Sequence, residues 1–389
     1  MQIVYTTESI PNEIVHSIFL AGPTLRSAQI GNGLQSWRVK ALAILELLNY
    51  NGIVFLPEPN PNNNQSFEQL DYETVHQWET KCLNIADRII FWINRDLDAG
   101  ILGLTTNTEF GQWMESGKCI LGTEPGADSV RYQEVWAKEL KIPTVHNLYE
   151  LIKQSIKLDQ PAVRTDGERH VPLMIWNTRQ FQDWYADLKR AGNQLQSGKV
   201  LKTFQASNGF IFAYVLWVNV YIQSEGRHKN NEFIVSRTDT SSCVLYYPRL
   251  DPMRTEVVVV SEFRSPVSNK KGLVYELPGG SAPKSDQDPI ITIIEEVEEE
   301  TGFKMDPNRI VSISKQQVCA TLLTHKTNLY SYQLNSNELD LFYQKRGLIF
   351  GKEEDTERTS VHVYRLGNIL DSELVDWSTI GMIMKAVQH

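Results

Sequence analysis

The amino-acid sequence predicts an α/β protein of two domains, a doubly wound parallel sheet followed by an α/β/α sandwich. Three observations support this prediction. The chain has 389 residues, which is too many for one ordinary hydrophobic core. Strand-like and helix-like segments alternate between residues 17 and 156, as they do in parallel sheets. After residue 210, strand-like segments dominate and surround one long amphipathic helix, which favours a sandwich.

The boundary between the two domains is expected where the two patterns meet. The segment 158–172 contains Pro161, Gly167 and several charged residues, a composition typical of a linker. We therefore expect one domain over residues 1–157 and a second over residues 173–389, joined by this linker.

Composition and charge indicate a globular protein without general affinity for nucleic acid. Apolar residues make up 41% of the chain and charged residues 22%, both ordinary values for a globular protein. The net charge of −9 argues against binding DNA or RNA through its phosphates. No signal-peptide pattern begins the chain, and no apolar run reaches the roughly 18 residues of a membrane span. The four cysteines are widely spaced, as expected of buried thiols in a reducing compartment. We expect a cytoplasmic protein that binds neither nucleic acid nor a membrane.

The first domain alternates five strand-like segments with helices. The expected strands are 17–21, 53–56, 87–93, 118–121 and 143–146, and the expected helices are 34–48, 72–85, 108–116, 132–140 and 148–156. Such connections give a parallel sheet with helices on both faces, a flavodoxin-like arrangement. Ligands of these sheets bind outside the carboxyl ends of the strands. Gly22, Pro23 and Thr24, the loop 96–106 and the helix start at Glu109 all fall at that edge.

Several short motifs of this domain resemble the nucleoside 2-deoxyribosyltransferase family over about residues 17–150. They are Phe19-Leu-Ala-Gly-Pro-Thr24, Ser36-Trp-Arg38, Gln77-Trp-Glu79, Ala86-Asp87 and Thr106-Asn-Thr-Glu-Phe-Gly111. The resemblance implies that Glu109 is a nucleophile that attacks the anomeric carbon of the sugar, and that Glu79 assists on the preceding helix. It also implies a loop aspartate, for which Asp98 or Asp96 is the candidate. Substrate contacts are expected at Gly22, Pro23, Thr24 and Asn107, and a homo-oligomer is expected.

These assignments have a chemical reason and an alternative. Cleavage of an N-glycosidic bond needs one carboxylate to trap or stabilise the sugar carbon and one acid to help the base leave. The alternative for Glu109 is a surface residue near a helix start. Trp78, Trp92 and Trp113 are able to stack a nucleobase, although a core position is the commoner fate of such residues.

The second domain combines many strands with one glutamate-rich helix. We expect a first helix over 178–191, strands at 210–222, 232–235, 243–247, 256–262, 311–318, 329–334 and 360–366, and a last helix over 379–387. Between these strands, five glutamates lie close together: Glu295, Glu296, Glu298, Glu299 and Glu300. Like charges on one helix face repel, and a hard cation such as Mg²⁺ relieves the repulsion. The alternative is a solvated acidic helix face.

The segment from Glu296 to Phe303 resembles the second half of the Nudix box, and Glu276-Leu-Pro-Gly-Gly280 leads into it. The resemblance implies that Glu296, Glu299 and Glu300 bind Mg²⁺, with Mn²⁺ as an alternative, and that Glu296 is also catalytic. Glu295 stands where the Nudix pattern has Arg. The position of the first Glu of the Nudix pattern corresponds to Gln287 when residues are counted back from the helix. It corresponds to Asp286 when residues are counted forward from Gly280.

Further residues of this domain resemble the branch of Nudix hydrolases that acts on ADP-ribose and nucleotide sugars. The segment Glu262-Phe-Arg264 precedes the Glu276 motif, and Arg264 is the expected substrate contact. The general base is expected in a later loop, among Glu353, Glu354, Asp355 and Glu357. His325 is a candidate phosphate contact, with a surface histidine as the alternative.

Together the two resemblances imply a bifunctional nucleotide-processing enzyme. One site would cleave or transfer an N-glycosidic bond, and the other would hydrolyse a pyrophosphate with Mg²⁺. The expected partner is a nucleotide or another small molecule linked to a nucleoside diphosphate. The alternative is a nucleotide-binding sensor in which one or both sites have lost catalysis.

Overall fold

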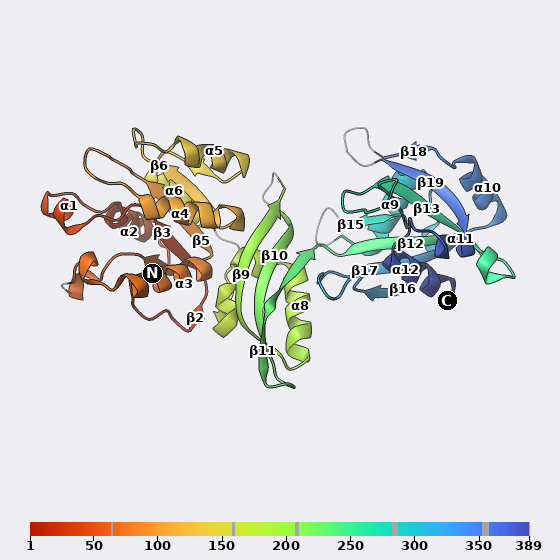
Figure 1. Ribbon diagram of the computed structural model, residues 1–389, viewed down its shortest axis with the longest axis horizontal. Helices are drawn as coiled ribbons and strands as arrows, with labels where there is room; N and C mark the ends of the chain where they lie inside the picture. The colour runs from red at the N-terminus through yellow and green to blue at the C-terminus, as the bar shows by residue number, and fades with distance from the viewer. Residues whose placement is uncertain (64, 158–159, 207–209, 282–286, 352–357, 389) are drawn as a thin grey trace. The chain divides into compact units, whose positions relative to one another are not determined.

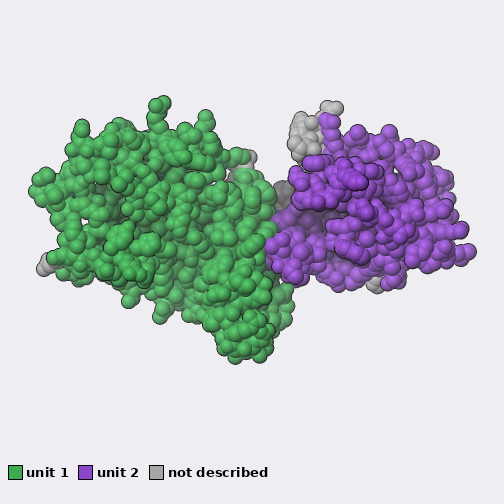
Figure 2. Space-filling view, viewed as in Figure 1, with its two compact units in different colours: residues 1–236 green, residues 237–389 purple. Residues whose placement is uncertain are grey.

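The computed structural model describes residues 1–389 except 64, 158–159, 207–209, 282–286, 352–357 and 389 (Figure 1). The chain forms two compact units, residues 1–236 (unit 1) and residues 237–389 (unit 2), shown in two colours in Figure 2. This division differs from the expected one, in which residues 173–236 belonged with the second half of the chain. Among the described residues, no helix combines the length and the apolar character that crossing a membrane requires.

Unit 1 begins with the parallel sheet that the sequence predicts. Its strands are β1 (Gln2–Tyr5), β3 (Ser17–Ala21), β4 (Ile53–Leu56), β5 (Arg88–Ile93), β6 (Cys119–Thr123) and β7 (Thr144–Val145), in the order β1-β4-β3-β5-β6-β7. All neighbouring strands in this order are parallel. Strands β3, β4 and β6 are buried along their whole length, because helices cover both faces of the sheet. Strand β1, which the sequence analysis missed, is short and lies at the edge.

Helices flank both faces of this sheet (Figure 1). They are α1 (Ser27–Gly31), α2 (Trp37–Leu47), α3 (Tyr72–Ile85), α4 (Leu104–Trp113), α5 (Arg131–Glu139) and α6 (Leu148–Ser155). Helices α3, α4 and α5 pack in one core cluster, and α2 and α6 pack in the cluster of the other face. Trp78, Trp92 and Trp113 are buried in these clusters, so the alternative of core tryptophans is confirmed. The doubly wound architecture is therefore present.

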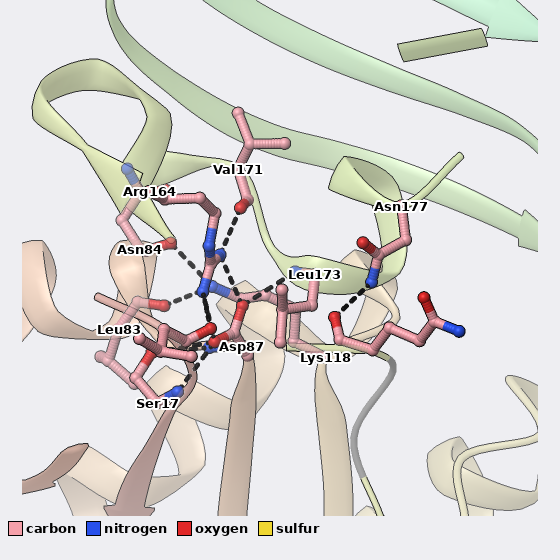
Figure 3. A network of polar contacts seen from close by, with 11 residues as sticks. Ser17, Leu83, Asn84, Asp87, Lys118, Arg164, Val171, Leu173 and Asn177 are labelled. Carbon is pink, nitrogen blue, oxygen red and sulfur yellow. Dashed lines mark hydrogen bonds and ion pairs between the residues drawn. The ribbon is translucent and has the colours of Figure 1, made fainter. Parts of the chain in front are cut away.

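Residues 164–172, the larger part of the expected linker 158–172, are anchored in the core of unit 1 (Figure 3). This segment contains β8 (Arg164–Thr165), which pairs with β2 (Glu13–Ile14), and the 3₁₀ turn η4 (Asp166–His170). Arg164 is fully buried and forms an ion pair of 2.7 Å with Asp87, which lies just before β5. Asp87 also accepts hydrogen bonds from the main-chain N–H groups of Ser17 and Leu173. Both carboxylate oxygens of the buried Asp87 are therefore paired, and these contacts tie the segment to the parallel sheet.

The remainder of unit 1 is a three-stranded antiparallel sheet covered by a helix. It comprises α7 (Leu173–Trp176), α8 (Arg179–Arg190), β9 (Gln194–Gln205), β10 (Ile211–Ile222) and β11 (Arg227–Arg237), in the strand order β11-β10-β9. Strand β9, which was not predicted, packs tightly on η4, because a β-carbon on Gly167 would lie 2.0 Å from the carbonyl oxygen of Leu195. Lys202 of β9 also pairs with Glu115 at 2.6 Å. These contacts join residues 164–236 to the parallel sheet.

Unit 2 is a mixed sheet between two layers of helices (Figure 1). Its strands are β12 (Thr240–Tyr247), β13 (Glu256–Phe263), β14 (Leu273–Glu276), β15 (Gly279–Ser281), β16 (Val311–Gln316), β17 (Thr327–Gln333), β18 (Ile349–Phe350) and β19 (Thr359–Arg365). The main order is β16-β17-β12-β13-β19-β18, with β14 beside β13 and β15 beside β12. Helices α9 (Pro289–Thr301) and α10 (Ser336–Gln344) pack in one cluster, and α11 (Leu366–Leu370) and α12 (Trp377–Val387) in the other.

The burial of the thiols is predicted correctly for Cys82, Cys119 and Cys243, whereas Cys319 is exposed. The expectation of buried thiols is therefore wrong at that one position.

Candidate functional site

The strand order of the parallel sheet reverses direction at β3. The chain passes from β3 through α2 to β4 on one side, and then through α3 to β5 on the other side of β3. Such a reversal of direction separates the loops that follow β3 and β5, and ligands of doubly wound sheets bind there. The loops concerned are Gly22–Pro23–Thr24 and the segment 94–103.

The turn after β3 is held by tight contacts on both sides. A β-carbon on Gly22 would lie 2.4 Å from the carbonyl oxygen of Trp92 on β5, so only glycine fits at this position. Pro23 packs against the start of α4, since a β-carbon on Gly103 would lie 2.9 Å from its ring. Gly103 has a left-handed conformation with φ of 61°, which also favours glycine. Gly22 and Pro23, expected to contact substrate, are closely packed in the turn after β3.

Arg38 on α2 anchors the same turn. No role was predicted for this residue, which belongs to the motif Ser36-Trp-Arg38. Its guanidinium donates to the carbonyl oxygens of Leu20, Gly22 and Pro23 and to Oγ1 of Thr24, at 3.0, 2.8, 3.3 and 3.1 Å. It also forms an ion pair of 2.9 Å with Glu58. Only 1% of Arg38 is exposed.

Glu79 and Glu109, the two expected catalytic carboxyls, lie near each other on neighbouring helices. Glu79 is on the third turn of α3, whose N-terminus is capped by Asp71. Glu109 is in the middle of α4. Both side chains are half-buried. Burial raises the pKa of Glu109 to about 8, and the charge of Glu79 contributes to that rise. Burial also raises the pKa of Glu79 to about 7, against the opposing charges of Arg38 and Arg26.

These pKa values give the pair a mixed protonation state near neutral pH. Two nearby carboxyls release their protons in two steps that belong to the pair. Between about pH 7 and pH 8, the pair of Glu79 and Glu109 therefore holds about one proton. One group then acts as an acid while the other acts as a base or nucleophile, which is the combination that cleavage of a glycosidic bond needs.

Asn107 lies about one helical turn after the start of α4 and is held from two directions. Its Oδ1 accepts hydrogen bonds from Arg95 at 2.5 Å and from Gln133 of α5 at 2.7 Å. Arg95 is buried and also donates to the carbonyl oxygens of Leu102 and Ser129. These two hydrogen bonds to Oδ1 of Asn107 hold α4 in place. The expected contact with substrate would therefore use the amide nitrogen of Asn107.

The candidates for the expected loop aspartate, Asp98 and Asp96, lie in the turn that follows β5. Asp98 is exposed in the turn between the bridged residues Asp96 and Ile101. The carboxylate of Asp96 accepts a hydrogen bond from the N–H group of Ala99 and so stabilises the turn itself. None of the contacts that define the pair of Glu79 and Glu109 involves Asp98.

In unit 2, the three glutamates expected to bind metal are the more buried ones of the cluster. Glu300 is buried and Glu296 and Glu299 are half-buried, whereas Glu295 and Glu298 are exposed. Oε2 of Glu300 accepts a hydrogen bond of 2.9 Å from the N–H group of Gly279. A β-carbon on Gly280 would lie 2.2 Å from Oε1 of Glu296, so this carboxylate rests on the backbone of β15. The expected acidic helix thus directs two carboxylates at the Gly279–Gly280 strand.

Arg264 is held by carboxylates on the same side of unit 2 as α9. It lies 2.9 Å from Glu276 and 2.8 Å from Glu262. Its guanidinium thus closes a cluster of acidic side chains at the edge of β13 and β14. Gln287, one candidate for the first Glu of the Nudix pattern, donates a hydrogen bond of 2.8 Å to Glu295 and not to the inward-facing glutamates.

The donor set of α9 suits a hard divalent cation, since all three expected ligands offer carboxylate oxygens. Glu296 and Glu300 fit this role best, because both carboxylates meet the backbone of β15. Among the described residues, however, no three His, Cys, Asp or Glu side chains gather closely enough to form a metal site. Binding of Mg²⁺ therefore requires side-chain movement or further ligands.

The expected general base and the expected position of His325 are the remaining predictions for unit 2. The candidate bases Glu353, Glu354, Asp355 and Glu357, and the alternative residue Asp286, lie outside the described residues. His325 is buried, so a surface position for it is wrong, and its Nδ1 has no hydrogen-bond partner among the described residues. Burial and the nearby charge of Arg237 lower the pKa of His325 to about 4.

Comparison with known proteins bears on unit 1. Residues 15–127 match a family model described as nucleoside 2-deoxyribosyltransferase like. This region contains the Gly22 turn, Arg38, Glu79 and Glu109, and it covers less than half of the chain. No curated protein matches the chain. The match supports a nucleoside-processing domain in unit 1 and does not extend to unit 2.

Proposed function

We propose that unit 1 is an enzyme that breaks or exchanges the N-glycosidic bond of a nucleoside or nucleotide. The single observation behind this proposal is the pair of Glu79 and Glu109 on α3 and α4, with pKa values raised to about 7 and about 8. The family match over residues 15–127 supports the same class of substrate. The loops that follow β3 and β5 lie where doubly wound sheets bind their ligands.

The proposed reaction has two steps. Glu109 forms and then loses a bond to the sugar, and Glu79 gives and then takes back a proton. The reaction starts from the form of the pair in which Glu109 is ionised and the single proton is on Glu79; the higher pKa of Glu109 makes this the less populated of the two singly protonated forms. A carboxylate oxygen of Glu109 forms a bond with the anomeric carbon, while the bond from that carbon to the base nitrogen breaks. The departing base takes a proton from the carboxyl of Glu79. Water or a second base then attacks the anomeric carbon, gives a proton to Glu79 and releases Glu109. Water as acceptor gives hydrolysis, and a base gives transfer.

The test is release of free base from a panel of nucleosides and nucleotides, followed by chromatography. Glu109→Gln removes the nucleophile and should lower kcat by a factor of about 10³ or more. Glu79→Gln should lower kcat by about 10²–10⁴ for substrates with a poor leaving group. Glu139→Gln, an exposed glutamate on α5, is the matched control and should retain activity. Equal activity of wild type and Glu109→Gln on every substrate that reacts would contradict the proposal.

A second activity is proposed for unit 2 on the basis of Glu296 and Glu300. We infer that this unit is a Nudix-type hydrolase that cleaves a nucleoside diphosphate linked to another group. The placement of both carboxylates on the Gly279–Gly280 strand favours it. Bound Mg²⁺ would neutralise the pyrophosphate and lower the pKa of a bound water. In this proposal Glu296, Glu299 and Glu300 hold the cation, and Arg264 orients a phosphate of the substrate.

This activity is tested with Mg²⁺ or Mn²⁺ and a panel that includes ADP-ribose and nucleotide sugars, with release of a nucleoside monophosphate as readout. Glu296→Gln and Glu300→Gln should each abolish the release, whereas Glu298→Gln, at an exposed position of the same helix, should leave it intact. Binding without turnover, measured by calorimetry, would instead favour the nucleotide sensor. If both units are active, the monophosphate from unit 2 is of the class that unit 1 would cleave.

A homo-oligomer in a cytoplasmic setting belongs to the same proposal. Sedimentation of the full chain tests the assembly state, and a strictly monomeric protein with full activity would contradict the expectation of an oligomer.

A further inference from the structure

Arg38 is a buried charge at the carboxyl edge of the parallel sheet. Its Nε donates to the carbonyl oxygen of Leu20, and its Nη2 donates to that of Gly22, at 3.0 and 2.8 Å. Its Nη1 reaches Thr24 at 3.1 Å and Glu58 at 2.9 Å. A charge with 1% exposure is costly unless it is fully hydrogen-bonded, and this network supplies the partners. The planar fork of arginine suits such a set of acceptors, whereas lysine offers one nitrogen.

The charge of Arg38 also acts on both candidate catalytic carboxyls. It favours the ionised form of Glu79 and of Glu109, and so opposes the rise that burial causes in both pKa values. The other charged groups around the pair are Arg26, which acts on Glu79, and Glu58, which pairs with Arg38. Helices α2, α3 and α4 and the segment before α1 therefore all contribute charge to this edge.

We propose that Arg38 is the positioning residue of this site, which holds the Gly22–Pro23–Thr24 turn in place and supplies the positive charge beside Glu79 and Glu109. This inference rests on the proposed N-glycosidic activity of unit 1. Arg38 touches the turn and not the reacting atoms, so its effect on the reaction passes through the turn and the two carboxyls.

Arg164 offers a matched comparison within unit 1. It is also a fully buried arginine with a carboxylate partner, Asp87, at 2.7 Å. Asp87 precedes β5 and binds Ser17 at the start of β3, so this pair lies at the amino ends of the strands (Figure 3). Loss of either arginine removes a buried ion pair. Only loss of Arg38 changes the charge beside Glu79 and Glu109.

The experiment compares Arg38→Gln, Arg38→Lys and Arg164→Gln in the full chain. The carboxyl carbons of Glu79 and Glu109 are titrated by NMR after ¹³C labelling, and their signals are assigned by loss in the corresponding Gln variants. Arg38→Gln should move both titrations upward by about one pH unit, because a nearby cation favours the carboxylate. Arg38→Lys keeps the charge and should leave the titrations in place. Arg164→Gln should leave them in place while destabilising the fold.

Enzyme kinetics provide the second readout, on any substrate that the panel identifies. With Arg38→Gln, both limbs of the pH profile of kcat/KM should move to higher pH, and kcat at pH 7 should fall about 100-fold. With Arg38→Lys, the loss should be smaller and the limbs should stay in place. Unchanged titrations in Arg38→Gln would overturn the inference, as would an equal shift in Arg164→Gln.

Glu58→Gln keeps the inference testable if Arg38→Gln does not fold. Removal of this carboxylate leaves the charge of Arg38 less compensated, so the titrations of Glu79 and Glu109 should move to lower pH. A shift to higher pH, or none, would contradict the inference. The NMR titration needs no substrate. A shift with no activity on any nucleotide would therefore refute the proposed reaction and leave the role of Arg38 in the charge of the site supported.

Discussion

Glu109→Gln should make the protein more stable at neutral and alkaline pH. The unfolded chain ionises this carboxyl near its ordinary pKa of 4.5, whereas the folded protein holds the proton up to about pH 8. The folded state therefore loses stability as the pH rises from about 4.5 to about 8, because the unfolded chain gives up its proton first. Glutamine is neutral at every pH and has nearly the same shape, so it removes this penalty.

The size of the effect follows from the difference between the two pKa values of Glu109. Each pKa unit corresponds to about 1.4 kcal/mol, so a rise from 4.5 to about 8 corresponds to about 5 kcal/mol at most. The side chain is half-buried, and contact with water reduces the penalty. We expect Glu109→Gln to raise the free energy of unfolding by about 2 kcal/mol at pH 8 and by less than about 0.5 kcal/mol at pH 5.

Urea denaturation at pH 5 and pH 8, followed by the fluorescence of the buried tryptophans, measures both values. Glu139→Gln is the control, because this glutamate of α5 is exposed and should change stability by less than about 0.5 kcal/mol at either pH. The reasoning fails if Glu109→Gln gives the same change at the two pH values, or if it destabilises the protein at pH 8.

Three further substitutions test the packing of the two units, each by denaturation and by the activity of its unit. Gly22→Ala should cost about 3 kcal/mol and most of the activity of unit 1, because its β-carbon would meet a main-chain oxygen of β5 at 2.4 Å; wild-type stability would contradict this. Asp87→Asn should cost about 3–5 kcal/mol, since it leaves the buried charge of Arg164 without its partner; a loss below about 1 kcal/mol would be too small. Gly280→Ala should displace Glu296 and weaken Mg²⁺ binding in calorimetry, and unchanged binding would exclude Glu296 as a ligand.

The parallel sheet of unit 1 could be predicted because its strands are continuous apolar runs. Segments such as 53–56 and 89–93 are buried on both faces, and no polar residue interrupts them. The alternation with amphipathic helices then fixed the topology class. The edge strand β1 carries one fully buried residue, Val4, and gave no comparable signal.

The boundary of unit 1 could not be predicted, because it depends on contacts between residues far apart in the chain. Arg164 and Asp87 are separated by 77 positions, and nothing in the local sequence shows that they pair. Pro161 and Gly167 suggested a linker, yet Gly167 is a glycine because β9 approaches it closely. A composition typical of a loop therefore also describes a segment that is packed into the core.

For the candidate site of unit 1, the sequence indicated the carboxyls of Glu79 and Glu109 but not the role of the cation Arg38. Glu79 and Glu109 stand in short motifs at recognisable positions of two helices. The role of Arg38 is visible only in the folded protein, where the turn after β3 packs against α2 and supplies the hydrogen-bond acceptors of Arg38. Asp98 was chosen for its place in the loop, and its side chain is exposed.

In unit 2 the resemblance to the Nudix box selected Glu296, Glu299 and Glu300, and these are the more buried glutamates of the cluster. Positions 296 and 300 lie one turn apart and both meet β15, as their spacing requires. The helical period does not show how far apart the carboxylates lie, and so it did not reveal that no group of three gathers among the described residues.

The central claim is that Glu109 forms a bond with the sugar of a nucleoside or nucleotide. Mass spectrometry of the protein, quenched with acid during turnover and then digested, tests it most directly. The account predicts a peptide containing Glu109 whose mass is increased by that of the glycosyl group, and no such peptide from Glu109→Gln. Rapid release of base with no adduct, or with the adduct on Glu79, would contradict it.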